Sequence, residues 1–157
     1  MTPADIGTIA ANAGFSGDDL VTAVAVAMAE SSGNPNAWGD AGIGAGSFGL
    51  WQISSKYHPE YGPDFTELYD PQTNANAAFA VYSQAGRSFS PWSTFKTGAY
   101  LANMKVALAQ LSQMAGEAVQ TVEDTASQAG QTIEDNPGTS TGVIIGILVL
   151  LFLLSRK

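Results

Sequence analysis

Cysteine is absent from this chain of 157 residues, and only one histidine is present. The absence excludes a disulfide framework and a thiolate metal site, and a single histidine argues against a metal site built from histidines alone. We therefore expect no metal and no cofactor. Basic residues are also scarce, because six Lys and Arg stand against fourteen Asp and Glu, and two of the six are Arg156 and Lys157 at the end of the chain. A chain this acidic is a poor nucleic-acid binder.

The two ends of the sequence differ in hydropathy. Residues 1–14 lack the basic and apolar regions of a secretory signal, whereas residues 143–154 form an uncharged apolar stretch followed by a basic pair. A bilayer usually needs about 20 residues, so a buried core helix is the alternative for this stretch. Apolar side chains on every face and a basic pair that reaches lipid headgroups favour a transmembrane helix. We predict a single-pass anchor at 139–157, with a lipid bilayer as partner.

The remaining sequence predicts a mainly α-helical fold. Residues 33–70 are rich in Gly, Asn, Pro and aromatics without sustained periodicity, which predicts loops with at most a short hairpin or helix around 50–53. Capping residues and helix-stop signals bound the helical segments. The predicted helices cover residues 3–13, 17–31 and 71–86, and a further helix begins near residue 97.

An internal repeat lies between the last apolar helix and the C-terminal stretch. The sequence "QTVED" at 120–124 returns as "QTIED" at 131–135, a period of 11 that suits a nearly straight helix. A disordered acidic spacer is the alternative, because its Ala, Thr, Gln and Ser bury little apolar surface. The sequence thus predicts a globular domain at 1–114, a helical or flexible acidic stalk at 115–138 and the anchor at 139–157.

A lone carboxylate, Glu30, follows an aliphatic run from Leu20 to Ala29 that only Thr22 interrupts. A helix that is apolar around most of its circumference is buried, so Glu30 should lie at the edge of the core, in the last turn where the helix dipole is negative. Both effects favour the protonated carboxyl, which is the form that donates a proton. A helix-end Glu turned to solvent is the alternative.

Three motifs resemble one family in their order and spacing: "AESSGNP" at 29–35, "GSFGLWQIS" at 46–54 and "SPWSTFKTGAY" at 90–100. They are similar to the soluble lytic transglycosylases and goose-type lysozymes, especially lysozyme-like domains of phage and actinobacterial wall-degrading proteins. The resemblance implies a lysozyme-like domain that cleaves the glycosidic bond between N-acetylmuramic acid and N-acetylglucosamine in peptidoglycan. It implies Glu30 as the catalytic acid, followed by Ser31, and a sugar groove lined by Gly49, Leu50, Trp51 and Gln52.

Glycan strands present hydroxyls, N-acetyl groups and partly apolar ring faces, so a groove for them needs amides and hydroxyls beside aromatic rings. Further candidates for sugar contact are therefore Asn34, Ser47, Tyr57, Trp92 and Tyr100, with core packing as the alternative for Trp51 and Trp92. The family's Ala-Tyr-Asn-x-Gly motif is altered here, because Phe95 and Lys96 replace its Tyr and Asn. The missing phenolic hydroxyl leaves Tyr82 or Tyr100 as candidate replacements.

A second carboxylate decides between two reactions. A hydrolase usually uses two carboxyl groups, whereas the transglycosylases of the family need one Glu, because the sugar's own 6-hydroxyl closes onto the anomeric carbon. Asp40 is the nearby candidate, and a turn residue between Gly39 and Ala41 is the alternative interpretation. His58 is expected to hold a loop. The sequence leaves hydrolase and lytic transglycosylase both open.

An anchored wall-degrading enzyme without an export signal fits the internal membrane of a phage virion, where it would aid genome entry beside other virion proteins. The alternatives are a tail-anchored wall-remodelling enzyme of the bacterial cytoplasmic membrane, an inactive glycan-binding module and a structural membrane protein. The last of these would not need the residues around Glu30.

Overall fold

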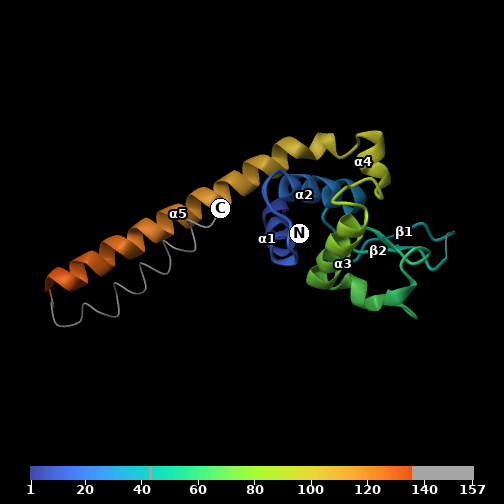
Figure 1. Ribbon diagram of the computed structural model, residues 1–157, viewed down its shortest axis with the longest axis horizontal. Helices are drawn as coiled ribbons and strands as arrows, with labels where there is room; N and C mark the ends of the chain where they lie inside the picture. Colours follow the sequence, from blue (N-terminus) through green and yellow to red (C-terminus); the bar gives the residue numbers. More distant parts are fainter. Residues whose placement is uncertain (43, 136–157) are drawn as a thin grey trace. The chain divides into compact units, whose positions relative to one another are not determined.

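The computed structural model describes residues 1–42 and 44–135, coloured along the sequence in Figure 1. Residues 1–112 form one compact unit, and a second unit begins at Gln113. Most of the first unit is helical, with a small sheet and two short 3-10 helices in the loops. The elements in chain order are α1 (Pro3–Ala13), α2 (Gly17–Ser31), β1 (Trp38–Gly39), β2 (Ser47–Phe48), β3 (Ile53–Ser54), η1 (Pro59–Tyr61), η2 (Thr66–Tyr69), α3 (Pro71–Gln84), α4 (Ser93–Thr97) and α5 (Leu101–Asp135).

Local sequence signals set the first two helices. Helix α1 begins with a capping box, in which the Thr2 hydroxyl accepts the N–H of Asp5 and the Asp5 carboxylate accepts the N–H of Thr2. Helix α2 buries five consecutive residues, Ala23–Ala27, so its middle is surrounded by other parts of the unit. Helix α1 packs against both α2 and α3 (Figure 1). Small side chains along α2 allow this close packing.

The three strands form one small antiparallel sheet in the order β1-β2-β3. Its register aligns Trp38, Phe48 and Ile53 in one row and Gly39, Ser47 and Ser54 in the other. Successive side chains of a strand point to opposite faces, so the two rows face opposite ways. Phe48 and Ile53 of the first row belong to the core, which leaves the row with two serines on the other face.

The loop after β2 is held from inside the core by Asn74 on α3. Its Oδ1 accepts the N–H of Trp51 at 2.9 Å, and its Nδ2 donates to the carbonyls of Phe48 at 2.9 Å and Leu68 at 3.0 Å. Gly49 passes directly over this amide with φ of +74°, and a Cβ there would stand 2.3 Å from Asn74 Nδ2. Only glycine combines that backbone angle with such a close approach.

A cluster of aromatic rings joins the loop between α1 and α2 to α3 and α4. Phe15 packs edge-on against Phe79 and lies 5.1 Å from the Tyr82 ring, measured between ring centroids. The Tyr82 hydroxyl donates to the Asp19 carboxylate, and burial together with this hydrogen bond raises the pKa of the phenol. The cluster continues through Phe89, Trp92, Phe95 and Tyr100.

The predicted helices 3–13 and 17–31 coincide with α1 and α2, and the predicted helix from 71 ends at Gln84 as α3. The helix expected from about residue 97 begins at Leu101 as α5, and a separate short helix, α4, precedes it. Gly98 ends the short α4 with φ of +78°, and α5 then begins at Leu101. A left-handed glycine is a common helix terminator.

Helix α5 continues into the second unit as far as Asp135, so residues 116–135 are helical rather than a disordered spacer. Side-chain hydrogen bonds four residues apart support this exposed part of the helix. Gln113 donates to Glu117 at 2.9 Å, and Gln120 donates to Asp124 at 3.0 Å.

The predicted membrane architecture is contradicted. Within residues 1–42 and 44–135, no helix is both long enough and apolar enough to cross a bilayer. The expectation of a single-pass membrane protein, whether in a virion or in the cytoplasmic membrane, is therefore corrected. The segment 139–157, on which that prediction rested, lies outside the described residues.

Candidate active site

A groove in the first unit has two lobes, with volumes of about 180 Å³ and about 320 Å³. Glu30, Asp40, Ser47 and Ser93 line only the smaller lobe. Four other residues line only the larger lobe: Ile53, His58, Val81 and Lys96. Both lobes share walls made by Gln52, Ser54, Tyr57, Pro91 and Trp92. The shared walls make the two lobes one continuous groove.

Glu30 reaches the smaller lobe because α2 ends one residue after it. Ser32, at the C-cap of α2, adopts a left-handed conformation with φ of +54° and donates its N–H to the Met28 carbonyl. The partly buried Glu30 carboxylate accepts the Thr94 hydroxyl at 2.7 Å and the Thr94 N–H at 3.5 Å. Thr94 lies on α4, which packs against α2. A carboxylate at a helix end thus faces the lobe, oriented by a single neighbouring residue.

Asp40 brings a second carboxylate to the same lobe. It lies in the glycine-rich loop after β1, with φ of +53°, and its side chain accepts the Ser47 hydroxyl at 2.8 Å. Ser47 is nearly fully buried on β2 and therefore holds the Asp40 carboxylate from a rigid position. The residues that the sequence suggested as acid and second carboxylate line one cavity.

Gln52 forms part of the wall between the lobes. Its Nε2 donates to the carbonyls of Ala37 at 3.1 Å and Gly49 at 2.9 Å, which uses both hydrogens of the amide. A ligand in the groove can therefore engage only the acceptor, Oε1. That oxygen lies beside Gly39, where a Cβ would come within 2.5 Å of it.

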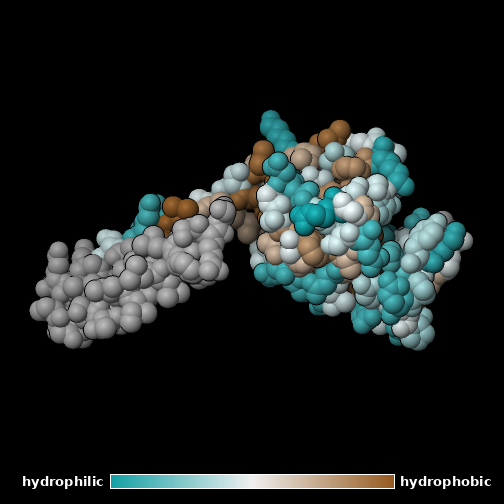
Figure 2. All heavy atoms as spheres, in the orientation of Figure 1, coloured by the Kyte–Doolittle hydropathy of each residue, from teal (hydrophilic) through white to brown (hydrophobic). Residues whose placement is uncertain are grey.

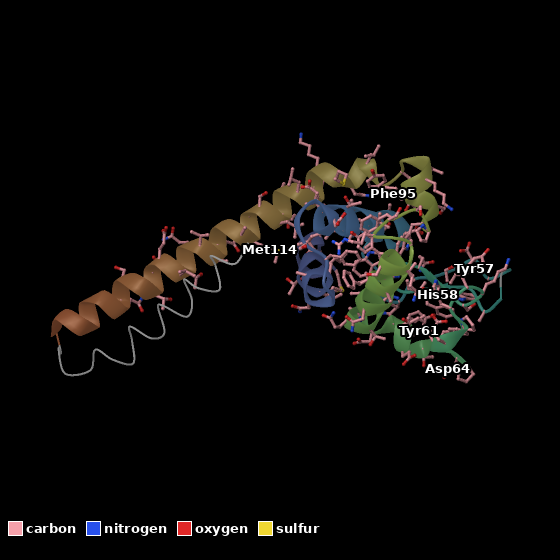
Figure 3. All side chains as sticks on the ribbon, in the orientation of Figure 1. Tyr57, His58, Tyr61, Asp64, Phe95 and Met114 are labelled. Carbon is pink, nitrogen blue, oxygen red and sulfur yellow. The ribbon has the colours of Figure 1, made fainter. Side chains whose placement is uncertain are left out.

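Two aromatic rings line both lobes. Tyr57 is 68 % exposed and follows β3, beside His58 (Figure 3). Trp92 is only 5 % exposed, and its Nε1 donates to the Trp51 carbonyl at 2.7 Å. Figure 2 shows mainly hydrophilic residues over the loops that follow α2.

Several residues predicted to contact sugar line neither lobe: Ser31, Gly49, Leu50, Trp51 and Tyr100. Leu50 and Trp51 are fully buried in the core, and Trp51 Nε1 donates to the Ala23 carbonyl at 3.0 Å. Ser31 donates its hydroxyl to the Ala27 carbonyl at 2.9 Å and so closes the last turn of α2.

The remaining two positions also have structural roles. Gly49 passes over Asn74, as described above, and Tyr100 stacks on Phe95 with 4.9 Å between ring centroids. Of the sequence-predicted set, the structure brings together Glu30, Asp40, Ser47, Gln52 and Trp92.

The family comparison agrees with this geometry. The family described as "Lysozyme like domain" matches residues 7–94, which include Glu30, the sheet, the glycine-rich loop and Thr94. The chain belongs to the lysozyme-like domain family. No curated protein and no solved structure matches it. Membership supports a glycosidase of the lysozyme and lytic transglycosylase type, with peptidoglycan glycan strands as substrate; it does not support a phage origin or a role in a virion.

In this lysozyme-like domain, the hydroxyl beside the Glu30 carboxylate belongs to Thr94, a residue that the sequence did not single out. Phe95, at the position of the family's Tyr, packs into the aromatic cluster and lines neither lobe (labelled in Figure 3). Tyr82 donates to Asp19, and neither Tyr82 nor Tyr100 lines either lobe of the groove. Thr94, inside the motif "SPWSTF", provides the hydroxyl instead. Its place next to the altered Tyr position is the only sequence signal that marked it.

No metal-binding cluster stands beside this groove in the part of the chain that the structure describes. Groups of three or more His, Asp or Glu side chains placed to hold an ion do not occur there. His58 Nδ1 and Glu60 Oε1 form a pair 3.1 Å apart in the loop after β3.

Replacing Thr94 tests whether its hydroxyl orients the acid. Thr94→Val keeps the shape but removes the donor, and we expect cleavage of peptidoglycan to slow by about tenfold, the equivalent of about 1.4 kcal/mol. Thr94→Ser should restore most of the rate, because serine supplies the same hydroxyl. Initial rates of turbidity loss with purified cell walls measure both. Equal rates for the Val and Ser variants would contradict this role.

Proposed function

We propose that this lysozyme-like domain cleaves the glycosidic bond between N-acetylmuramic acid and N-acetylglucosamine, with Glu30 as general acid and then general base. The observation that carries the proposal is the placement of Glu30, partly buried at the end of α2 and facing a cavity that Asp40, Ser47 and Ser93 also line. A carboxyl group shielded in this way, with one hydroxyl donor to orient it, is suited to proton transfer. Family membership supplies the substrate class.

In the proposed mechanism Glu30 first donates a proton to the glycosidic oxygen as the bond to the anomeric carbon breaks. The resulting carboxylate then removes a proton from the 6-hydroxyl of the same muramoyl sugar, and that oxygen closes onto the anomeric carbon. The products are a 1,6-anhydro sugar and a free 4-hydroxyl on the leaving sugar, and Glu30 returns to its protonated form. Thr94 keeps its hydrogen bond to the carboxylate when it is charged, which stabilises the intermediate stage.

The competing reaction is hydrolysis, in which a water molecule replaces the 6-hydroxyl and a second carboxylate activates it. Asp40 is the candidate for that role, because it lines the lobe that contains Glu30. We favour transglycosylation, since Asp40 is exposed on a glycine-rich loop and one of its oxygens already accepts the Ser47 hydroxyl.

Asp40→Asn separates the two reactions. The amide oxygen can still accept the Ser47 hydrogen bond, so we expect the loop to stay in place and the rate to fall by less than about tenfold if one carboxylate suffices. Kinetics on purified peptidoglycan, beside the Glu30→Gln variant, measure the change. A loss as deep as that of Glu30→Gln would mean that the enzyme is a hydrolase with two carboxylates.

Mass analysis of the digestion products tests the proposal directly. Anhydromuramic ends are expected from peptidoglycan treated with the whole protein, and reducing muramic ends would identify a hydrolase.

The replacement of the motif Tyr and Asn by Phe95 and Lys96 favours one other candidate, an inactive glycan-binding module. Binding to peptidoglycan in a sedimentation assay without release of any fragment would establish that function in place of ours.

A further inference from the structure

The larger lobe of the groove has no part in the proposed bond cleavage. Neither Glu30 nor Asp40 lines it, although it is the more spacious of the two at about 320 Å³. Ile53, Val81 and Pro91 contribute apolar surface, and Lys96 and His58 stand at its polar positions. A lobe with aliphatic walls and an ammonium group differs in chemistry from the acidic lobe beside it.

Charge is distributed unevenly over the two lobes. Among the described residues there are four Lys and Arg side chains, and Lys96 is the one that lines the groove. Arg87 contacts the Asp19 carboxylate at 3.3 Å, and Lys105 lies on α5, outside both sets of lining residues. Lys56 adds a second ammonium nearby, 5.1 Å from the centroid of the Tyr57 ring that both lobes share.

His58 adds a polar atom to the same lobe. Its Nδ1 pairs with Glu60 Oε1 at 3.1 Å, which orients the ring on the loop after β3. The Nδ1 proton is engaged in that contact, so Nε2 is the ring atom left for a ligand. Tyr57 and His58 are neighbours on this loop (Figure 3), and both line the larger lobe.

We infer that the larger lobe binds a carboxylate-bearing substituent of the muramoyl sugar, with Lys96 as its ion-pair partner. The inference rests on the proposed function and deepens it. The shared walls place the lobe next to the cavity of Glu30, so a group that branches from a sugar at the scissile bond can enter it. Aliphatic walls suit the carbon chain of such a group, and the ammonium suits its negative end.

Two sources supply this chemistry in peptidoglycan. A peptide-free muramoyl sugar carries the carboxylate of its lactyl ether, whereas a substituted one carries the carboxylates of its stem peptide. An N-acetylglucosamine oligomer has neither and serves as the neutral reference. Lys96 is thus a specificity-determining residue, which selects muramoyl strands over uncharged glycans by charge.

The test measures binding by calorimetry in whole protein that carries Glu30→Gln, so that ligands stay intact. Lys96→Met, which keeps the length and removes the charge, should weaken binding of a muramoyl oligosaccharide about two- to fivefold, as expected for an exposed ion pair. Lys96→Arg should restore it, and added salt should reduce the difference. The neutral hexamer of N-acetylglucosamine should bind all variants equally. Lys105→Met is the matched control, and we expect no change from it.

Ligand choice identifies the source of the carboxylate. A loss confined to the peptide-bearing oligosaccharide assigns the lobe to the stem peptide, and a loss confined to the peptide-free one assigns it to the lactyl group. Equal losses for the neutral hexamer, or no loss for any ligand, would overturn the inference. Cleavage by the parent protein is measured alongside. If the parent protein cleaves peptidoglycan but binding does not depend on Lys96, only the inference fails. If binding depends on Lys96 but no cleavage occurs, only the proposed function fails.

Discussion

Glu30→Gln is expected to lower the rate of peptidoglycan cleavage by about 10²- to 10⁴-fold while the protein stays folded. Glutamine has nearly the same shape, and its carbonyl oxygen can still accept the Thr94 hydroxyl. It has no acidic proton to give to the glycosidic oxygen. Zymography and turbidity assays on purified walls measure the rate, and thermal unfolding shows whether the fold survives.

A matched substitution controls for the loss of a negative charge. Glu67 lies exposed on η2 and is absent from the lining of both lobes, so Glu67→Gln should keep the parent rate. If the Glu30 variant retained more than a few per cent of the parent activity, Glu30 could not be the proton donor. Another carboxylate would then have to be sought, beginning with Asp40.

Asn74→Ala is expected to lower the free energy of unfolding by about 2–4 kcal/mol. Asn74 is fully buried, and its removal leaves the Trp51 N–H and the carbonyls of Phe48 and Leu68 without their partners. The loop that it holds leads directly to Gln52, so cleavage should fall along with stability. Urea unfolding followed by circular dichroism measures the first effect, and turbidity assays measure the second.

Asn76→Ala, on the same helix, distinguishes burial from helix propensity. Asn76 is exposed, and its side chain accepts a single hydrogen bond from Gln72 at 3.0 Å. We expect a change of no more than about 0.5 kcal/mol from it. Similar losses from the two alanine variants would show that the hydrogen bonds of Asn74 are not what stabilises the loop.

Local features of the structure could be predicted from sequence alone. The bounds of α1 follow from the Thr2 capping box and the left-handed Gly14, which act within one helical turn of the positions they terminate, and the apolar run of α2 ends at the left-handed Ser32. For the same reason Glu30 could be assigned to the end of a buried helix. Its presence in the motif "AESSGNP" added the chemistry, and the family match at 7–94 supports the substrate class.

The roles of the aromatic residues could not be predicted in this way. Trp51 belongs to a motif associated with a sugar groove, yet its ring is fully buried and bonded to the Ala23 carbonyl. Tyr57, which lies in none of the three motifs and was a candidate for sugar contact by residue type alone, is exposed and lines both lobes. Which face of a loop meets the core depends on residues that pack against it from elsewhere, here Asn74 on α3.

The sequence by itself determined the helices at the start of the domain and the acid at the end of the second one, because short-range hydrogen bonds and apolar periodicity are set by neighbouring residues. Only the tertiary structure decided what surrounds that acid. Thr94 lies 64 positions after Glu30, and the two meet because α4 packs against α2. Contacts between distant segments depend on how the whole core packs, and no local pattern of residues encodes that geometry.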